Sequence, residues 1–316
     1  MSAIAKLARQ PWIFAFVAAV AVWLATAAFT HGQGAGGVLS VAFTFATFFV
    51  IVAIGQMFVV TLGPGNVDLS IPATMTLAGT VSMKIMDGAN WMILPGYLIA
   101  VAVGLVVGLF NVALIRLLRI PPIIATLSSS FVIQSAAIWY NRGLRVKPPT
   151  LLADFTTAKI FGLPVLAIIV ILIAAVMHVV LTRTVYGRTV IAIGQNARAA
   201  RLAGLDVGRV RLATYVMCAV FAASCGYVLA GFSGGAALNM GQEYLLSSIA
   251  VVVIGGTSVA GGFANVPGLW GAALFLFLLV TMLNTFGLGA GVRLVLTGLI
   301  IITVIVIAGG SRANAR

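Results

Sequence analysis

Long runs of hydrophobic residues, separated by short polar breaks, follow one another along nearly the whole chain. A helix that crosses a membrane needs about 20 predominantly apolar residues, and many of the runs reach or approach that length. The pattern predicts about ten helices, over residues 12–30, 38–62, 70–86, 92–115, 121–140, 164–182, 211–231, 245–262, 268–287 and 291–308. We therefore expect an all-α polytopic membrane protein, with residues 1–316 forming a single transmembrane domain.

The charged residues sharpen this prediction. Only 7% of the chain is charged and 62% is hydrophobic, whereas about a quarter of an ordinary soluble domain is charged. The net charge of +13 comes from sparse Lys and Arg residues between the apolar runs. This is the positive-inside pattern of a membrane protein and offers no surface for nucleic acid. With the N-terminus inside, twelve of the 18 Lys and Arg residues are cytoplasmic, which predicts that both termini are cytoplasmic.

Two breaks between the runs are rich in Gly and Pro: TLGPGNVDLSIP at 61–72 and VIGGTSVAGGFANVPG at 253–268. Both fall on the predicted inner side, yet neither contains Lys or Arg. They are either re-entrant turns buried within the protein beside a substrate path, or tight exposed turns, and the sequence leaves both open. Each follows a Val-Val pair and precedes a Pro, which makes an internal inverted repeat of five helices and five a further hypothesis.

The segment from 183 to 211 holds six of the 18 basic residues, an unusual density for so apolar a chain. Within it, Asn196 is a favourable N-cap and Gly204 suits the position just after a helix, which predicts a two-turn helix over 197–203. Arg198, Arg201 and Leu202 would share one face of that helix.

Two interpretations of this short helix are open. Its arginines could lie against anionic lipid, where each basic residue contributes about 1 kcal/mol. Alternatively, the helix could seat in a groove on a cytoplasmic protein, because a helix this short is unstable without a partner surface. An apolar ridge formed by Leu202, Leu205 and Val207 between the charges favours the second interpretation.

Motifs for catalysis are missing from the sequence. There is no G-x-x-x-x-G-K-[ST] phosphate-binding loop, no Gly followed by Lys, and no G-x-S-x-G nucleophile motif. The two histidines, His31 and His178, are isolated and suggest no metal site. We therefore expect that the chain is not an enzyme and binds no cofactor or metal itself.

Four sequence blocks, in order, resemble the permease subunits of bacterial ABC importers for monosaccharides, the ribose-type group. The blocks are NVDLSIPATMTLAG, IPPIIATLSSSFVIQSAAI, GRTVIAIGQNARAARLAGLDVGRVRL and VIGGTSVAGGFANVPGLWGAALFLFLLVTMLN. The likeness extends over about residues 40–308. The chain departs from the family pattern at Pro64, at Ala197 and Arg198, and at Ser128 and Ser129.

The resemblance implies a helical domain in the bacterial inner membrane that pairs with a second permease, as a homodimer or a heterodimer. Its other partners would be a periplasmic substrate-binding protein and either two cytoplasmic ATPase subunits or one fused ATPase, which would bind the ATP and Mg. The segment at about 183–211 would then couple the permease to the ATPase, through Asn196, Arg198, Arg201, Leu202 and Gly204.

Further polar residues are candidates for the translocation path or gate: Asn66, Asp68, Ser70, Ser130 and Gln134. Asp68 could hydrogen-bond sugar hydroxyls or hold an inner gate, but the favoured interpretation is that it caps the helix predicted at 70–86, with Pro72 in its first turn. Ser130 and Gln134 could line a polar path, or bind neighbouring helices.

Four basic residues fall outside, against the topological trend: Arg142, Arg145, Lys147 and Lys159. They would either dock acidic patches of a binding protein or lie on a solvated loop, and both interpretations are open.

The sequence therefore predicts the transmembrane subunit of an ATP-driven importer for a monosaccharide or polyol. An importer permease for a nucleoside or another small polar solute is an alternative. A stand-alone secondary transporter is another, although titratable residues inside the spans would then be expected.

Overall fold

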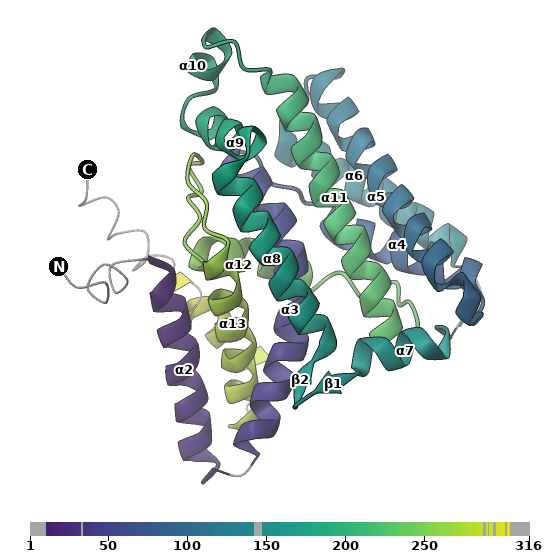
Figure 1. Ribbon diagram of the computed structural model, residues 1–316, viewed down its shortest axis with the longest axis vertical. Helices are drawn as coiled ribbons and strands as arrows, with labels where there is room; N and C mark the ends of the chain where they lie inside the picture. Colours follow the sequence, from purple (N-terminus) through teal and green to yellow (C-terminus); the bar gives the residue numbers. More distant parts are fainter. Residues whose placement is uncertain are drawn as a thin grey trace, which may run out of the picture.

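The computed structural model describes residues 11–32, 34–141 and 147–286, together with 289, 291–292, 295–300 and 302–303. These residues form a bundle of helices with one small hairpin at an end (Figure 1). The elements are α2 (Pro11–Phe29), α3 (Ala35–Thr61), α4 (Ile71–Met86), η1 (Asn90–Met92), α5 (Ile93–Arg116), α6 (Pro122–Tyr140), α7 (Thr150–Thr157), β1 (Lys159–Ile160), β2 (Leu163–Pro164), α8 (Val165–Arg183), α9 (Val185–Gln195), α10 (Ala197–Leu202), α11 (Val207–Phe232), α12 (Tyr244–Ile254) and α13 (Pro267–Thr285).

Six helical stretches of the described residues are long and apolar enough to cross a membrane: Ala35–Thr61, Asn90–Arg116, Pro122–Tyr140, Val165–Arg183, Val207–Phe232 and Pro267–Thr285. Shorter apolar helices accompany them at Ile13–Phe29 and Tyr244–Ile254, while α4 has 16 residues. The prediction of an all-α polytopic membrane protein is thus confirmed. The prediction of ten spans is not, and the last of them, 291–308, lies partly outside the described residues.

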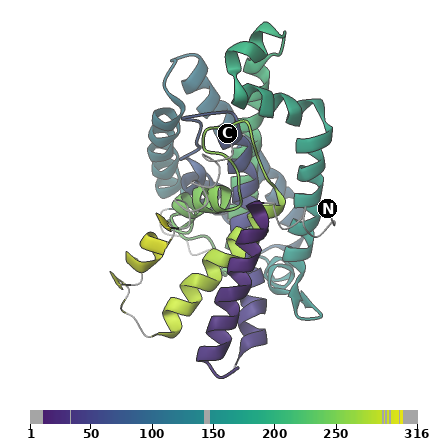
Figure 2. The same cartoon turned by 90° about the vertical axis from the view of Figure 1, so that its left-hand side faces the viewer.

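Helix α11 lies at the centre of the bundle and packs against α3, α4 and α5. Glycines allow these close approaches: a methyl group added at Gly108 of α5 would stand 2.5 Å from the Cα of Val216, and one at Gly226 would stand 2.1 Å from the carbonyl oxygen of Met75. Small residues at helix contacts are typical of membrane proteins, where dispersion and close packing drive association. On another side of the bundle, α2 and α13 run against each other (Figure 2).

The helix predicted at 245–262 is shorter than expected, because α12 ends at Ile254. The following residues form a loop in which Gly256, Gly261 and Gly262 have positive φ angles of 99°, 82° and 72°. Side-chain-bearing residues rarely adopt this conformation, and it ends the helix. The α3–α4 turn is buried or half-buried apart from its tip at Pro64–Gly65, and the α12–α13 loop is buried or half-buried apart from Val259, Ala260 and Phe263. Both are therefore packed within the protein over most of their length.

Three elements were not predicted: α7, the β1–β2 hairpin and α9. The hairpin and α7 lie at the end of the bundle opposite α10 (Figure 1). Helix α9 follows α8 after a break at Thr184, whose side chain caps α9 by accepting a hydrogen bond from the N–H of Gly187. The bundle thus has two distinct ends, one carrying α9 and α10 and the other carrying α7 and the hairpin.

Candidate coupling helix and buried polar cluster

The predicted short helix is present as α10, and its caps are formed as expected. The Asn196 side-chain oxygen accepts hydrogen bonds from the N–H groups of Arg198 (3.0 Å) and Ala199 (2.9 Å). At the other end Gly204 has a φ of 82°, and the N–H of Leu205 donates to the Ala200 carbonyl at 3.1 Å. This is a Schellman motif, in which a left-handed glycine satisfies the last carbonyls of the helix. Local residues alone therefore define both ends of α10.

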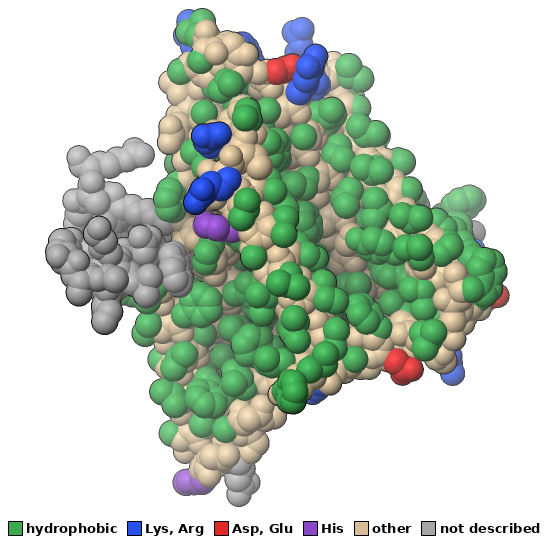
Figure 3. Space-filling view, in the orientation of Figure 1, with side chains coloured by type: hydrophobic (Ala, Val, Ile, Leu, Met, Phe, Trp, Pro, Cys, Tyr) green, Lys and Arg blue, Asp and Glu red, His purple; other side chains and the backbone are tan. Residues whose placement is uncertain are grey.

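The orientation of α10 follows from burial. Ala200 is buried against the protein, whereas Arg198, Arg201 and Leu202 are exposed, and Leu202 keeps 83% of its surface in solvent. The predicted apolar ridge is wrong in one respect, because Val207 is buried and Leu205 is half-buried, so both pack into the bundle instead of extending the exposed face. Figure 3 shows basic side chains gathered at this end of the molecule and an apolar surface along the sides.

The end of α9, just before α10, packs directly against both glycine-rich segments. The N–H of Gly262 donates to the Thr61 carbonyl at 3.0 Å. A methyl group at Gly194, near the end of α9, would stand 1.9 Å from that same carbonyl oxygen and 2.3 Å from the nitrogen of Gly262. One at Gly261 would stand 2.3 Å from the Cα of Gly63. We call Thr61, Gly63, Gly194, Gly261 and Gly262 the glycine contact. It joins the residues just before α10 to the turns that lead into α4 and α13.

A buried network of polar side chains lies beside the α3–α4 turn. The Oδ1 atom of Asp68 accepts hydrogen bonds from the N–H (2.9 Å) and hydroxyl (2.6 Å) of Ser70. The Asn111 amide donates to the Ser70 hydroxyl at 2.8 Å, and the Ser129 hydroxyl donates to the Asn111 side-chain oxygen. From α3, the Gln56 side-chain oxygen accepts from the Asp68 N–H at 3.2 Å. We call these five residues the polar cluster.

Two further bonds attach the turn to its surroundings. The Tyr215 hydroxyl of α11 donates to the Asn66 side-chain oxygen at 3.2 Å, and the Thr126 hydroxyl of α6 accepts from the N–H of Leu69 at 3.1 Å. The turn is thus held by side chains from α3, α5, α6 and α11. Among the candidate path residues, Asn66, Asp68 and Ser70 are brought together here, all buried.

Asp68 does not cap α4, contrary to the structural alternative considered for it. The N-cap is Ser70, and Asp68, two positions before that residue, accepts hydrogen bonds from its backbone and side chain. The expected Pro72 in the first turn is present. Burial raises the pKa of the Asp68 carboxyl above its usual range, and the hydrogen bonds from Ser70 oppose that shift. Its Oδ2 atom and the Gln56 Nε2 atom are buried without hydrogen-bond partners.

Two predicted path residues lie away from the polar cluster. Ser130 is half-buried, and it is its neighbour Ser129, facing α5, that joins the network. Gln134 instead donates a hydrogen bond to the Leu238 carbonyl, in the loop before α12, at 2.8 Å. Sequence reasoning gave Ser129 and Gln56 no site role, because the facing side of an almost wholly apolar helix leaves no clear amphipathic pattern.

Two of the four candidate docking residues, Lys147 and Lys159, lie at the opposite end from α10. Lys147 and Lys159 are both exposed, on either side of α7, and Arg142 and Arg145 fall outside the described residues. No group of three or more His, Cys, Asp or Glu side chains able to hold a metal ion occurs among the residues that the structure describes.

Apolar spanning helices, buried glycine-rich turns and a short basic helix at one end define a polytopic membrane transport protein. Comparison with known proteins specifies the family. Residues 38–308 match the family described as "Branched-chain amino acid transport system / permease component", and the chain belongs to this family of transport permeases. It is a permease of the ribose-type ABC importer group, which is not an enzyme family.

Three relatives illustrate the relationship. The autoinducer 2 import system permease protein LsrC of Enterobacter sp. (strain 638) is 29% identical over 97% of this chain and 89% of its own length. The ribose import permease protein RbsC of Bacillus subtilis (strain 168) is 30% identical over 81% of this chain and 80% of its own. The fructose import permease protein FrcC of Rhizobium meliloti is 26% identical over 77% and 70%. No solved structure gives a significant match.

Proposed function

We propose that the chain is the transmembrane subunit of an ATP-driven importer and forms, with a second permease, the pathway for a monosaccharide or polyol. Family membership and relatives named for ribose, fructose and autoinducer 2 support an import role for sugar-like solutes. A periplasmic binding protein delivers the solute. Cytoplasmic ATPase subunits bind the ATP and Mg.

The geometry of α10 carries the proposal. The helix is too short to be stable alone in water, yet both of its ends are capped and it presents Arg198, Arg201 and Leu202 outward. Its base is fixed to the two turns through the glycine contact. A partner that moves α10 would therefore move the turns leading into α4 and α13. This is the arrangement required of a helix that couples an ATPase to a gate.

The topology follows from charge. The α10 end carries exposed arginines, including Arg116, Arg119, Arg198 and Arg209, and the positive-inside rule assigns this end to the cytoplasm. The end with α7, Lys147 and Lys159 is then periplasmic and meets the binding protein. Both chain termini belong on the cytoplasmic side, as the sequence predicts.

A neutral solute fits the polar cluster. Asp68 is the one charged side chain that is buried among the described residues, and its neighbours are amides and hydroxyls. An ionic solute or a proton relay would require charged partners inside the spans. We infer that Asn66, Asp68 and Ser70 belong to the inner gate, where the same amide and hydroxyl chemistry can meet sugar hydroxyls.

Reversal of charge on α10 tests the coupling role. Arg198→Glu with Arg201→Glu is expected to abolish co-purification of the ATPase from native membranes while leaving membrane insertion intact. Arg183→Glu with Arg188→Glu is the matched control, since these exposed arginines carry the same charge in the same segment. Retention of the ATPase by the α10 variant, or equal loss in both variants, would contradict the proposal.

The substrate class needs a separate test. The reconstituted complex, with its binding protein, is given radiolabelled ribose, fructose, adenosine and leucine in turn. Uptake of a sugar, dependent on ATP, is expected. Uptake of adenosine alone would support the nucleoside alternative, and uptake of leucine alone would overturn the assignment to a sugar-like solute.

A further inference from the structure

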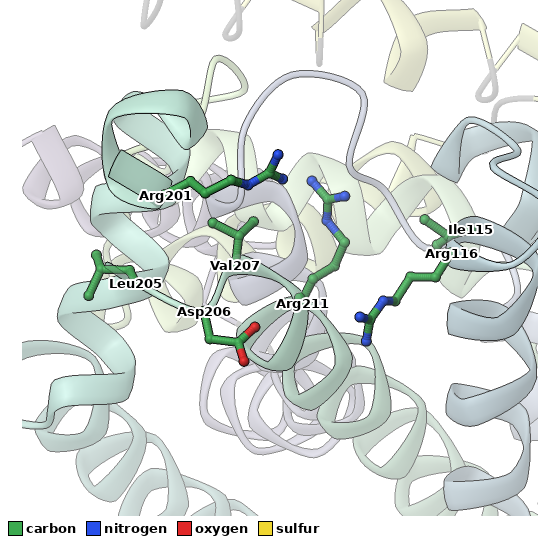
Figure 4. Close-up of a pocket in the computed structure, with 8 residues that line it drawn as sticks. Ile115, Arg116, Arg201, Leu205, Asp206, Val207 and Arg211 are labelled. Carbon is green, nitrogen blue, oxygen red and sulfur yellow. The ribbon is translucent and has the colours of Figure 1, made fainter. Parts of the chain in front are cut away.

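At the α10 end a cavity of about 500 Å³ lies between the last turn of α5, α10 and the first turns of α11. Three arginines line it, each from a different element: Arg116 from α5, Arg201 from α10 and Arg211 from α11. Figure 4 shows the guanidinium groups of Arg201 and Arg211 approaching each other, with that of Arg116 on the other side of the Arg211 side chain. The cavity therefore concentrates positive charge where the coupling helix meets two spanning helices.

The one acidic residue that lines this cavity, Asp206, already has hydrogen-bond and ion-pair partners. Asp206 caps α11, where its Oδ1 atom accepts from the Arg209 N–H at 2.9 Å, and its Oδ2 atom pairs with the Arg209 side chain at 3.0 Å. Within the described residues, none of the three cavity arginines takes part in an ion pair. The Nε atom of Arg211 is buried and has no hydrogen-bond partner. Arg211 thus presents a buried donor without an acceptor, beside the exposed guanidinium groups of Arg116 and Arg201.

The backbone adds to the attraction for an anion. A methyl group at Gly208 would stand 2.9 Å from the Arg116 Nη2 atom, so the absence of a side chain lets this guanidinium rest on the first turn of α11. The N-terminus of this 26-residue helix also carries partial positive charge. Both features favour an acceptor-rich ligand.

We propose that this cavity binds a phosphate-bearing anion, either a free phosphate compound or the headgroup of an anionic phospholipid. The planar fork of an arginine matches two phosphate oxygens at once, and three such forks surround the space. A bound phosphate bridges α10 to α5 and α11 and so restrains the coupling helix. The cavity shares Arg201 with the proposed coupling face of α10. Anion binding itself does not require the transport function, but the restraint on α10 as a coupling helix rests on the proposed function.

Binding is measured on the purified full-length chain with two probes. The first is inorganic phosphate, titrated in detergent against chloride at matched ionic strength. The second is phosphatidylglycerol, counted by native mass spectrometry after extraction from phosphatidylcholine bilayers that contain it. Arg116→Gln with Arg211→Gln is compared with Arg183→Gln plus Arg188→Gln, which removes the same charge from exposed positions elsewhere.

We expect the cavity variant to weaken one of the two probes by at least about tenfold, while the control matches the unmodified chain. Loss of phosphate binding identifies a free anion as the ligand, and selective loss of phosphatidylglycerol identifies a lipid headgroup. Arg211→Lys keeps the charge but loses the planar guanidinium fork, so its affinity for the probe should lie between those of the unmodified chain and the double variant. This single variant also controls for misfolding of the double variant. If neither probe separates the cavity variant from the control, the proposal is wrong and the arginines serve another partner.

Discussion

The glycine contact and the polar cluster adjoin the same turn, between α3 and α4, but they hold it by different means. At Gly194 and Gly261 the backbones meet so closely that no side chain fits between them. In the polar cluster the turn is held by side-chain hydrogen bonds, and two polar atoms, on Asp68 and Gln56, remain unpaired. One region has no room for a side chain, whereas the other has unused hydrogen-bonding capacity.

This difference suggests how motion passes through the molecule. A contact of backbone on backbone has no flexible side chain to absorb a displacement, so we expect a movement of α9 and α10 to be passed on to the turn. A hydrogen-bonded cluster with spare donors and acceptors can exchange partners at low cost, because an unpaired buried group gains free energy from any new bond. We therefore assign transmission to the glycine contact and switching to the polar cluster.

The largest expected effect comes from a side chain at the glycine contact. In Gly194→Ala the new methyl group would overlap the Thr61 carbonyl, and we expect a loss of more than about 3 kcal/mol in folding stability, together with loss of uptake. Melting in detergent and uptake in proteoliposomes measure the two losses. Gly37→Ala is the control, because nothing lies within 4 Å of its added methyl group. A Gly194 variant as stable as this control would show that the glycine contact does accommodate a side chain.

An intermediate effect is expected at the centre of the polar cluster. Asn111→Leu keeps the side-chain size but leaves the hydroxyls of Ser70 and Ser129 without their amide partner, so it should cost about 2–4 kcal/mol. Asn239→Leu, at an exposed loop position, is expected to change the folding stability by no more than about 0.5 kcal/mol relative to the unmodified chain. Equal melting temperatures for the two variants would show that the cluster contributes no stability.

The smallest effect separates two adjacent serines. Ser129→Ala removes one buried hydrogen bond to Asn111 and should cost about 1 kcal/mol, whereas Ser130→Ala, outside the cluster, should change stability by less than about 0.5 kcal/mol. Thermal melting of the Ser129→Ala and Ser130→Ala variants in the same detergent measures this difference in stability. A larger loss at Ser130 would place the polar face of α6 one residue further along, as the sequence alone suggested.

Much of this architecture could be predicted from the sequence, because the signals were local. Asn196 and Gly204 defined α10 through the hydrogen bonds that their own types favour, and the length of the apolar runs located the spanning helices α3, α5, α6, α8, α11 and α13. The two glycine-rich turns were identified as unusual, and their burial as one of two outcomes.

The errors concern interactions between distant segments. The rotation of α6, which brings in Ser129 in place of Ser130, depends on where α5 lies. Asp68 looked like a helix cap because it follows a Gly-Pro break and precedes Pro72, whereas the folded turn places Ser70 at the N-cap. Helix α12 was predicted too long because apolar residues continue to Ile254 and the glycines that end it are themselves weakly hydrophobic. The glycine contact joins positions 61, 194 and 262, and no single stretch of sequence signals it.

Crosslinking from Leu202, an exposed residue of α10, tests directly whether an ATPase binds this helix. Cys218 and Cys225 are buried, so Leu202→Cys introduces an accessible thiol that can carry a photoreactive probe in native membranes. The account predicts capture of a protein with a G-x-x-x-x-G-K-[ST] motif, in a yield that changes with ATP, and no such capture from Lys159→Cys at the opposite end. Capture of lipid alone from position 202 would contradict it.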